Sequence, residues 1–319
     1  MTFSCALDQW NVQSKHLIMV PYAYISNMET GLNVAENRNN KQKILYLKNC
    51  CVTLISAKLN NPEADVALVT NIDIPEPFAM CLKQADVAII TVPFDKFNFG
   101  EGYTWGLAFY KLCAQYYISH NTEYDAIACL DSDIYTQACF MPIWQASQSS
   151  VMLYRLGSRY ENFRASRIYE EAEKFTKNKQ DFVHYGGEFL VASSEKMRVI
   201  SEKALEIFYK MQSANFCVTT GDEFITSVVA NDLRYEIKLA NKYIFRFWTG
   251  AYRSISPDYK TTLICLHVPA EKKTGMLRLY NYVCAGYLPP KEKVWSILHI
   301  PRRSLIESVK YIIKKILKS

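Results

Sequence analysis

The chain has 319 residues, a formal net charge of +6, and hydrophobic residues at half of its positions. A chain of this length and composition can bury a large core, which excludes an intrinsically disordered protein. The positive excess is small and gathers near the C-terminus, so the sequence shows no broad basic surface of the kind that binds nucleic acid.

Patterns typical of strands and helices alternate through the first half of the chain. Apolar runs typical of buried strands cover 16–24, 65–70, 86–92 and 126–130. Helical spacing of apolar residues covers 41–59, 78–84 and 103–119. This alternation predicts an α/β fold with a doubly wound parallel sheet. Ligands of such sheets bind beyond the carboxyl ends of the strands, so the residues directly after 126–130 are the first candidates for a site.

Two aspartates follow the apolar run 126–130. Asp131 and Asp133 flank Ser132, and at the exit of a buried strand both carboxylates can share a divalent cation and, through it, a diphosphate. The alternative is a solvated turn that caps a helix starting near Thr136. We favour the metal site, because two acids at the end of a buried strand repel one another unless a cation or solvent lies between them.

The segment 124–135 (YDAIACLDSDIY) resembles the strand and Asp-x-Asp motif of GT-A glycosyltransferases. It is similar to that of family 8, the group of glycogenin and the bacterial galactosyltransferases. Members of this family carry a basic residue on the helix before the strand, and Lys111 holds a similar place here. The resemblance implies a GT-A fold, an α/β fold with a mixed, mainly parallel sheet flanked by helices. It also implies binding of the donor by Lys111, Asp131 and Ser132.

A late segment, 267–273, resembles the His-x-x-Gly-x-x-Lys motif of family 8, although Ala270 replaces the glycine. The usual Pro-Trp after the lysine is Thr274-Gly275 here. The resemblance implies that His267 completes a site for Mn²⁺ or Mg²⁺ with the two aspartates, and that Lys273 binds the donor diphosphate. The alternative for His267 is a structural histidine at the end of the strand-like run 261–266.

Two further segments resemble family 6, the group of the blood-group transferases and α-1,3-galactosyltransferase. The segment 181–192 (DFVHYGGEFLVA) is similar to its acceptor segment, and 220–223 is similar to its Asp-Glu pair ahead of a helix. In that family the glutamate is the proposed nucleophile or stabilises the cation at the sugar. The resemblance and the neighbouring residues give three catalytic candidates and three acceptor-binding candidates: Asp222, Glu223 and Glu188, and His184, Gly186 and Gly187.

These assignments have structural alternatives. Asp222 can instead cap the helix that follows it, and the pair Gly186-Gly187 suits a β-bulge as well as a close approach to a ligand. Glu188 is assigned as the group that accepts the proton of the acceptor hydroxyl. The resemblance also implies that the end of the first strand lies where GT-A enzymes hold the nucleobase, so Tyr22 or Tyr24 can stack on a uracil-type ring, with Asn71 as a further wall. Simple packing is the alternative for both tyrosines.

The ten cysteines form no ribbon or redox motif, because no two of them are separated by two residues. Several, such as Cys129 and Cys265, lie within apolar runs, so we expect reduced packing residues of a cytoplasmic protein. The N-terminus shows no signal sequence, and no run approaches the roughly 20 apolar residues that cross a bilayer.

The segment 305–318 predicts a basic amphipathic helix, with aliphatic residues on one side and lysines opposite. It can lie on an anionic membrane surface, or it can dock its apolar side on the domain or on a partner. We favour a peripheral position on the cytoplasmic membrane face because of the gathered positive charge. The predicted division is therefore a GT-A catalytic domain over 12–290 and a C-terminal helical segment over 291–319.

Together these features predict a metal-dependent hexosyltransferase. It would move a sugar from a nucleotide-diphosphate donor, a UDP-sugar, to a hydroxyl of a glycan, a lipid-linked saccharide or a protein. The resemblance implies retention of configuration, and the alternative is an inverting GT-A enzyme, which would use an acidic base at a similar place. A sugar-phosphate nucleotidyltransferase is the first alternative, but residues 21–27 lack the glycine-rich basic loop expected after its first strand. The second alternative is a non-catalytic, membrane-associated binding module, in which loss of the acids would be expected.

Overall fold

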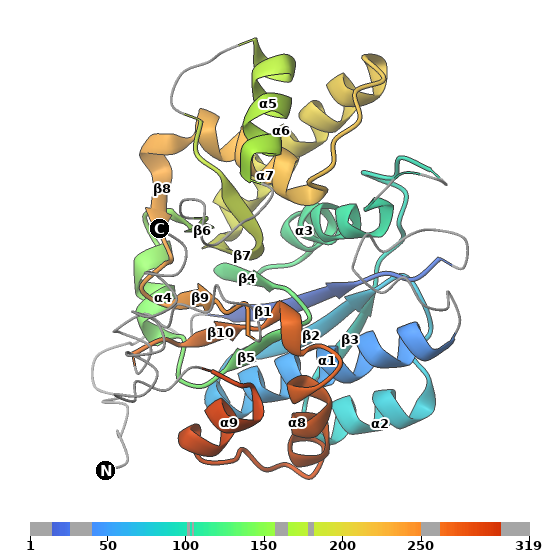
Figure 1. The fold of residues 1–319 in the computed structure, drawn as a ribbon, viewed down its shortest axis with the longest axis vertical. Helices are drawn as coiled ribbons and strands as arrows, with labels where there is room; N and C mark the ends of the chain where they lie inside the picture. The colour runs from blue at the N-terminus through green and yellow to red at the C-terminus, as the bar shows by residue number, and fades with distance from the viewer. Residues whose placement is uncertain are drawn as a thin grey trace, which may run out of the picture.

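The computed structural model describes residues 15–25, 40–100, 103, 105–156, 165–177, 182–249 and 262–300. Its centre is a seven-stranded sheet with the strand order β3-β2-β1-β4-β7-β6-β8 (Figure 1). The strands are β1 (His16–Tyr22), β2 (Asp65–Thr70), β3 (Ala88–Thr91), β4 (Ala126–Leu130), β6 (Val151–Arg155), β7 (Tyr185–Ser193) and β8 (Ile237–Leu239).

Pairing in this sheet is mainly parallel. Strands β1, β2, β3 and β4 run parallel, as the alternation of strands and helices predicts. Strand β7 is antiparallel to both of its neighbours, β4 and β6, whereas β6 and β8 are again parallel. The predicted mixed, mainly parallel α/β sheet is therefore confirmed.

Helices cover both faces of the sheet (Figure 1). One face carries α1 (Asn40–Asn60), α2 (Glu76–Gln84), α8 (Gly275–Val283) and α9 (Lys291–Ile297). The other carries α3 (Tyr110–Asn121), α6 (Ser194–Ser213) and α7 (Asp222–Asp232). The remaining helices are α4 (Met141–Ser147), α5 (Ala165–Thr176), and the 3-10 helices η1 (Gly106–Phe109), η2 (Arg234–Glu236) and η3 (Pro269–Glu271).

Two hydrophobic cores lie on the two faces because successive side chains of a strand alternate between them. In β1, Ile18 and Val20 pack on the side of α1, while Leu17 and Met19 pack on the side of α3. Every residue of β4 is buried, which explains why this strand reads as an unbroken apolar run.

A second, three-stranded sheet holds the segments that follow β4. Strand β5 (Ile134–Thr136) is antiparallel to β10 (Cys265–His267), which is parallel to β9 (Ile244–Arg246). The ends of β4, β9 and β10 thus meet in one region, although β4 lies far from β9 and β10 in the sequence.

Several expected elements need correction. The helix that the structural alternative placed near Thr136 is strand β5 instead, because residues 134–136 pair with β10. The expected helix over 103–119 begins as η1 and continues as α3 to Asn121. The strand expected over 86–92 is β3, an edge strand whose side chains are mostly exposed.

The expectation of reduced cysteines is wrong for two of them. Cys81 in α2 and Cys284, directly after α8, form a disulfide across 203 positions of sequence. Both helices pack on the same face of the sheet as α1, which brings the two thiols together. The seven other cysteines of the described residues form no disulfide, and all but Cys139 and Cys217 are buried.

The predicted C-terminal helix over 305–318 lies outside the described residues, so its membrane role stays a prediction. Within the described part, no helix is both long and apolar enough to span a membrane. Helix α9 lies beyond the expected boundary at residue 290, and it packs on α8 while Trp295 donates a hydrogen bond to Gln137. The domain division also stays a prediction.

Candidate metal centre

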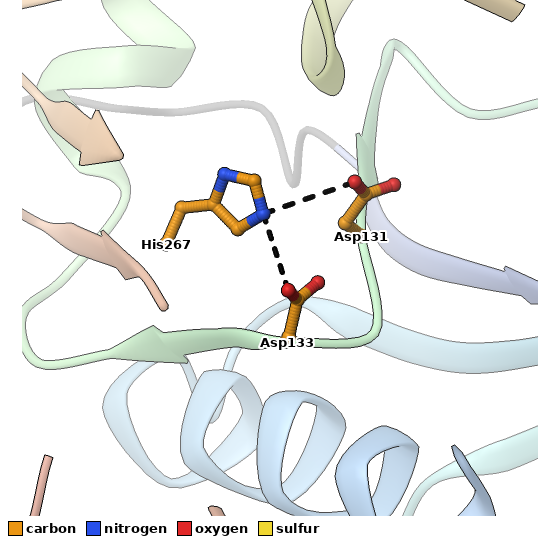
Figure 2. A group of neighbouring side chains, drawn as sticks. All are labelled: Asp131, Asp133 and His267. Carbon is orange, nitrogen blue, oxygen red and sulfur yellow. Dashed lines mark ion pairs between the residues drawn. The ribbon is translucent and has the colours of Figure 1, made fainter. Parts of the chain in front are cut away.

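Asp131, Asp133 and His267 converge beyond the carboxyl end of β4. One ligand atom from each lies within 4.8 Å of the other two. The imidazole Nε2 lies 3.3 Å from Oδ2 of Asp133 and 3.9 Å from Oδ2 of Asp131, and it points between the two carboxylates (Figure 2). The predicted trio is therefore assembled, with two oxygens and one nitrogen facing a common space.

Backbone pairing places these three residues. Asp131 directly follows β4, and its N–H donates to the carbonyl of Glu188 in the neighbouring strand β7. His267 ends β10 opposite Ile134 of β5, and the next N–H, that of Val268, donates to the carbonyl of Asp133. The hydroxyl of Thr53 in α1 donates to the carbonyl of Ser132, which fixes the turn between the aspartates.

Two lysines, Lys272, which is buried, and Lys111, which is largely buried, contact the aspartates. Lys272 forms an ion pair with Asp133, and Nζ of Lys111 lies 2.6 Å from Oδ1 of Asp131. Lys111 extends from α3, where it also binds the carboxylate of Asp222 at 2.9 Å and the carbonyl of Gly187 at 2.8 Å. Lys111 therefore joins the metal trio to the start of α7.

A second group of charged side chains lies against His267. Its Nδ1 lies 3.2 Å from Glu188, whose carboxylate accepts two hydrogen bonds from Arg246 at 2.7 and 2.6 Å. Arg246 also donates to Glu223 at 2.7 Å, and Nε2 of His184 lies 3.0 Å from the other oxygen of Glu223. The chain of contacts therefore runs from the metal trio to Glu223 at the start of α7.

Burial and charge oppose one another at these groups. Burial alone would raise the pKa of Asp133 and of Glu188, but the charges of Lys272 and Arg246, together with His267, hold both pKa values well below the usual carboxyl range. Burial also opposes the charge of Glu223, yet Arg246 and His184 lower its pKa to about 2. All three carboxyls are therefore ionised at neutral pH.

Asp222 and His267 shift in the other direction. Burial raises the pKa of Asp222 to about 6 even though Lys111 opposes the shift. Burial would lower the pKa of His267, but the charge of Asp133 and hydrogen bonds to Asp133 and Glu188 outweigh it and raise the pKa to about 9. The acids around His267 therefore favour a positive charge in their midst.

The described cluster holds more acids than bases. Its five carboxylates are those of Asp131, Asp133, Glu188, Asp222 and Glu223. Its three permanent cations are those of Lys111, Arg246 and Lys272. A histidine that binds a metal ion does so as the neutral imidazole. With the histidines left out of the count, two negative charges of the cluster have no permanent cation among the described side chains. A divalent ion matches this deficit, and carboxylate oxygens suit Mn²⁺ and Mg²⁺. The residues present therefore fit a divalent metal.

The catalytic and acceptor-binding candidates lie in this same cluster. Glu188 and His184 are fully buried, while the side chain of Glu223 keeps 21% of its surface exposed. Asp222 occupies the first turn of α7, and Gly221, with a φ of 67°, takes the capping position. The carboxylate of Asp222 accepts a hydrogen bond from Lys111, so the alternative that Asp222 caps this helix is wrong.

The two glycines of β7 make room for charged side chains. A Cβ at Gly186 would overlap Oε2 of Glu188 and lie 2.8 Å from Nη2 of Arg246. A Cβ at Gly187 would overlap Oδ2 of Asp222 and lie 3.1 Å from Nζ of Lys111. Their assignment as acceptor-binding residues stays a prediction, but the close approach they permit is to the protein's own carboxylates.

Replacing Gly187 with alanine is expected to lower the free energy of unfolding by about 1–3 kcal/mol, the range for overpacked interiors. The new methyl group would displace Asp222 from Lys111. Chemical denaturation measures the change, and a double-mutant cycle with Asp222→Ala identifies its cause. Because that change removes the overlapping carboxylate, Gly187→Ala should cost less in the Asp222→Ala background, and fully additive costs would contradict this explanation.

The donor-binding candidates outside the cluster differ in their burial and in the groups they contact. Tyr24 and Asn71 lie together, because the backbone N–H of Tyr24 donates to Oδ1 of Asn71 at 2.9 Å, and Nζ of Lys43 lies 5.3 Å from the ring centre of Tyr24. Tyr22 is buried in the core with its ring 6.4 Å from that of Tyr46. Lys273 is exposed.

The sequence reasoning missed Lys272 and Arg246. Lys272 is the buried member of an adjacent lysine pair, and it contacts the trio where Lys273 was expected to act. Arg246 ends β9 within the apolar run 244–248, and register pairs it with His267. An arginine inside such a run is a usable signal, since an arginine is rarely buried without a partner.

Comparison with known proteins finds a similar fold and no similar sequence. No protein family model matches the chain, and no curated protein matches it either. A crystal structure of the galactosyltransferase LgtC, in complex with donor and acceptor sugar analogues, matches 88% of this chain and 99% of its own, with 12% identity and a TM-score of 0.54. An active-site mutant of LgtC matches the same shares with 14% identity and a TM-score of 0.53. The chain therefore has the mixed α/β fold of the GT-A type, as the resemblance in its sequence implied.

Proposed function

We propose that this protein is a metal-dependent glycosyltransferase. In this proposal it moves a hexose-type sugar from a UDP-sugar to a hydroxyl of a glycan, a lipid-linked saccharide or a protein, with retention of configuration. The observation that carries the proposal is the convergence of Asp131, Asp133 and His267 beyond β4, in a fold shared with a sugar-transferring enzyme.

We assign binding of the donor diphosphate to Asp131, Asp133 and His267, together with Lys111 and Lys272 beside them. A bound divalent cation would offset the charge of the leaving diphosphate. Among the carboxylates of the cluster, Asp131 is the most accessible, with 29% of its side chain exposed, whereas Asp133 is almost fully buried. Lys111 and Lys272 supply fixed positive charge beside the two aspartates. This arrangement suits a ligand that carries several negative charges.

We assign the interaction with the transferred sugar to Glu223. It is the second most accessible carboxylate of the cluster, and Arg246 and His184 hold its two oxygens. Its lowered pKa keeps it charged at neutral pH, so it can stabilise positive charge that develops at an anomeric carbon. A strongly paired carboxylate of this kind is a poor proton acceptor, which favours a nucleophilic or cation-stabilising role.

A panel of UDP-hexoses with Mn²⁺ tests the proposal. We expect one donor to release UDP slowly, as measured by phosphorus NMR. This release should stop when EDTA removes the metal ion. The anomeric configuration of a transferred sugar, read by proton NMR, tests retention. Turnover that requires pyrophosphate would instead indicate a nucleotidyltransferase. If no nucleotide sugar of a broad panel is hydrolysed or transferred, the result contradicts an enzyme of this class and favours a binding module.

A further inference from the structure

The two ring nitrogens of His267 face different partners. Nε2 faces the carboxylates of Asp131 and Asp133, while Nδ1 lies 3.2 Å from Oε1 of Glu188. An ionised carboxylate only accepts hydrogen bonds, so the N–H that meets Glu188 is on Nδ1. A metal ion bound between the aspartates would take the place of the proton on Nε2, and the neutral imidazole would then keep its N–H on Nδ1 and present the lone pair of Nε2 to the metal.

Glu188 is held from two directions. Its backbone carbonyl accepts the N–H of Asp131, and its fully buried carboxylate accepts two hydrogen bonds from Arg246. Because a side chain with no exposed surface does not meet an incoming acceptor, this geometry differs from the role of proton acceptor that the sequence suggested. The carboxylate instead meets only side chains of the protein.

Arg246 joins this carboxylate to the sugar half of the site. Its Nη2 donates to Glu188 at 2.6 Å and to Glu223 at 2.7 Å, while its Nε donates to Glu188 at 2.7 Å. The planar fork of a guanidinium fixes the directions of these bonds, which the single ammonium of a lysine does not do. The positions of Glu188 and Glu223 are therefore set by one side chain.

We propose that Glu188 and Arg246 are a positioning pair: Glu188 holds His267 in the tautomer that presents Nε2 to the metal, and Arg246 fixes Glu188 relative to Glu223. This inference rests on the proposed function, because it assigns the pair to the metal of that reaction. In this role Glu188 would not contact the donor or the acceptor, because its side chain is fully buried. Loss of Glu188 is therefore expected to weaken metal binding and to affect the chemical step only through the metal.

Mn²⁺ binding to the full chain tests the inference without any turnover. The signal of free Mn²⁺ in electron paramagnetic resonance gives the Kd, with and without UDP. Glu188→Gln is expected to weaken binding by roughly 10–100-fold, the effect typical of a lost partner behind a metal ligand. Glu236→Gln is the matched control, because Glu236 forms a part-buried ion pair with Lys196 outside the cluster, and its Kd should equal that of the wild type.

Turnover then separates positioning from proton transfer. If Glu188 acts through the metal, saturating Mn²⁺ restores the kcat of Glu188→Gln to nearly that of the wild type. A loss of kcat that Mn²⁺ does not restore would instead make Glu188 the proton acceptor and overturn the inference. Arg246→Lys keeps the charge without the fork, so it should show the same shift in Mn²⁺ dependence.

The remaining outcomes are also decisive. A Kd for Glu188→Gln within twofold of the wild type overturns the positioning pair and leaves the proposed function standing. Failure of the wild type to bind Mn²⁺ overturns both. Should Glu188→Gln not fold, Glu188→Leu with Arg246→Met removes both charges of the buried pair together, a change that folded proteins tolerate better. A weakening of at least the same size is expected of it, because leucine offers Nδ1 of His267 no acceptor.

Discussion

Replacing Asp133 with asparagine should nearly abolish metal-dependent turnover and also destabilise the fold. The side chain is almost fully buried, and it contacts both His267 and Lys272. Loss of a metal ligand removes several kcal/mol of transition-state stabilisation, about a 10³-fold fall in kcat/KM. Loss of its charge also leaves Lys272 buried without its partner, which lowers the free energy of unfolding by about 3–5 kcal/mol.

Two further variants separate these effects. Asp133→Asn with Lys272→Met removes both charges of the buried pair, so most of the stability should return while turnover stays lost. Asp131→Asn should lose turnover with a smaller loss of stability, because Asp131 is partly exposed. Urea denaturation and donor hydrolysis measure the two quantities. Metal-dependent turnover that survives in Asp133→Asn would remove the basis of the proposed function.

Replacing Glu223 with glutamine should lower kcat by about 10²–10³-fold and leave the Kd of the UDP-sugar within twofold of the wild type. The range is that measured when one preorganised group that stabilises transition-state charge is removed. Glutamine keeps the shape and can still contact Arg246 and His184, so the change removes charge more than structure.

Steady-state kinetics and calorimetry with the donor distinguish the two parameters. The control is again Glu236→Gln, which removes a carboxylate charge from an ion pair elsewhere. If Glu223→Gln weakens donor binding as much as it lowers kcat/KM, Glu223 contributes to binding of the donor in the ground state and does not specifically stabilise the transition state.

The first half of the fold could be predicted from the sequence because its signals are local. Strand β4 reads as a five-residue apolar run since both of its faces are buried, and the chain leaves it through Asp131. The direction of β7 was not predictable in the same way. It depends on pairing with β4 and β6, and the antiparallel choice leaves no mark on the pattern of apolar residues.

The site was predicted where a motif carries it and missed where tertiary structure does. Asp131, Asp133 and His267 belong to recognisable motifs. Which of two adjacent lysines turns inward depends on η3, the short helix just before them, and a local pattern does not fix that phase. Arg246 comes beside the trio only because β9 pairs with β10. The disulfide joins cysteines 203 positions apart, so its pairing was likewise not readable from the sequence.

The bond between Cys81 and Cys284 has a practical consequence for handling the protein. A protease that cuts the backbone once, anywhere between these residues, leaves two fragments that stay covalently attached. Such nicked molecules would migrate as intact chain on a denaturing gel without reductant and would separate only after reduction. Integrity of a preparation therefore has to be judged on a reduced gel.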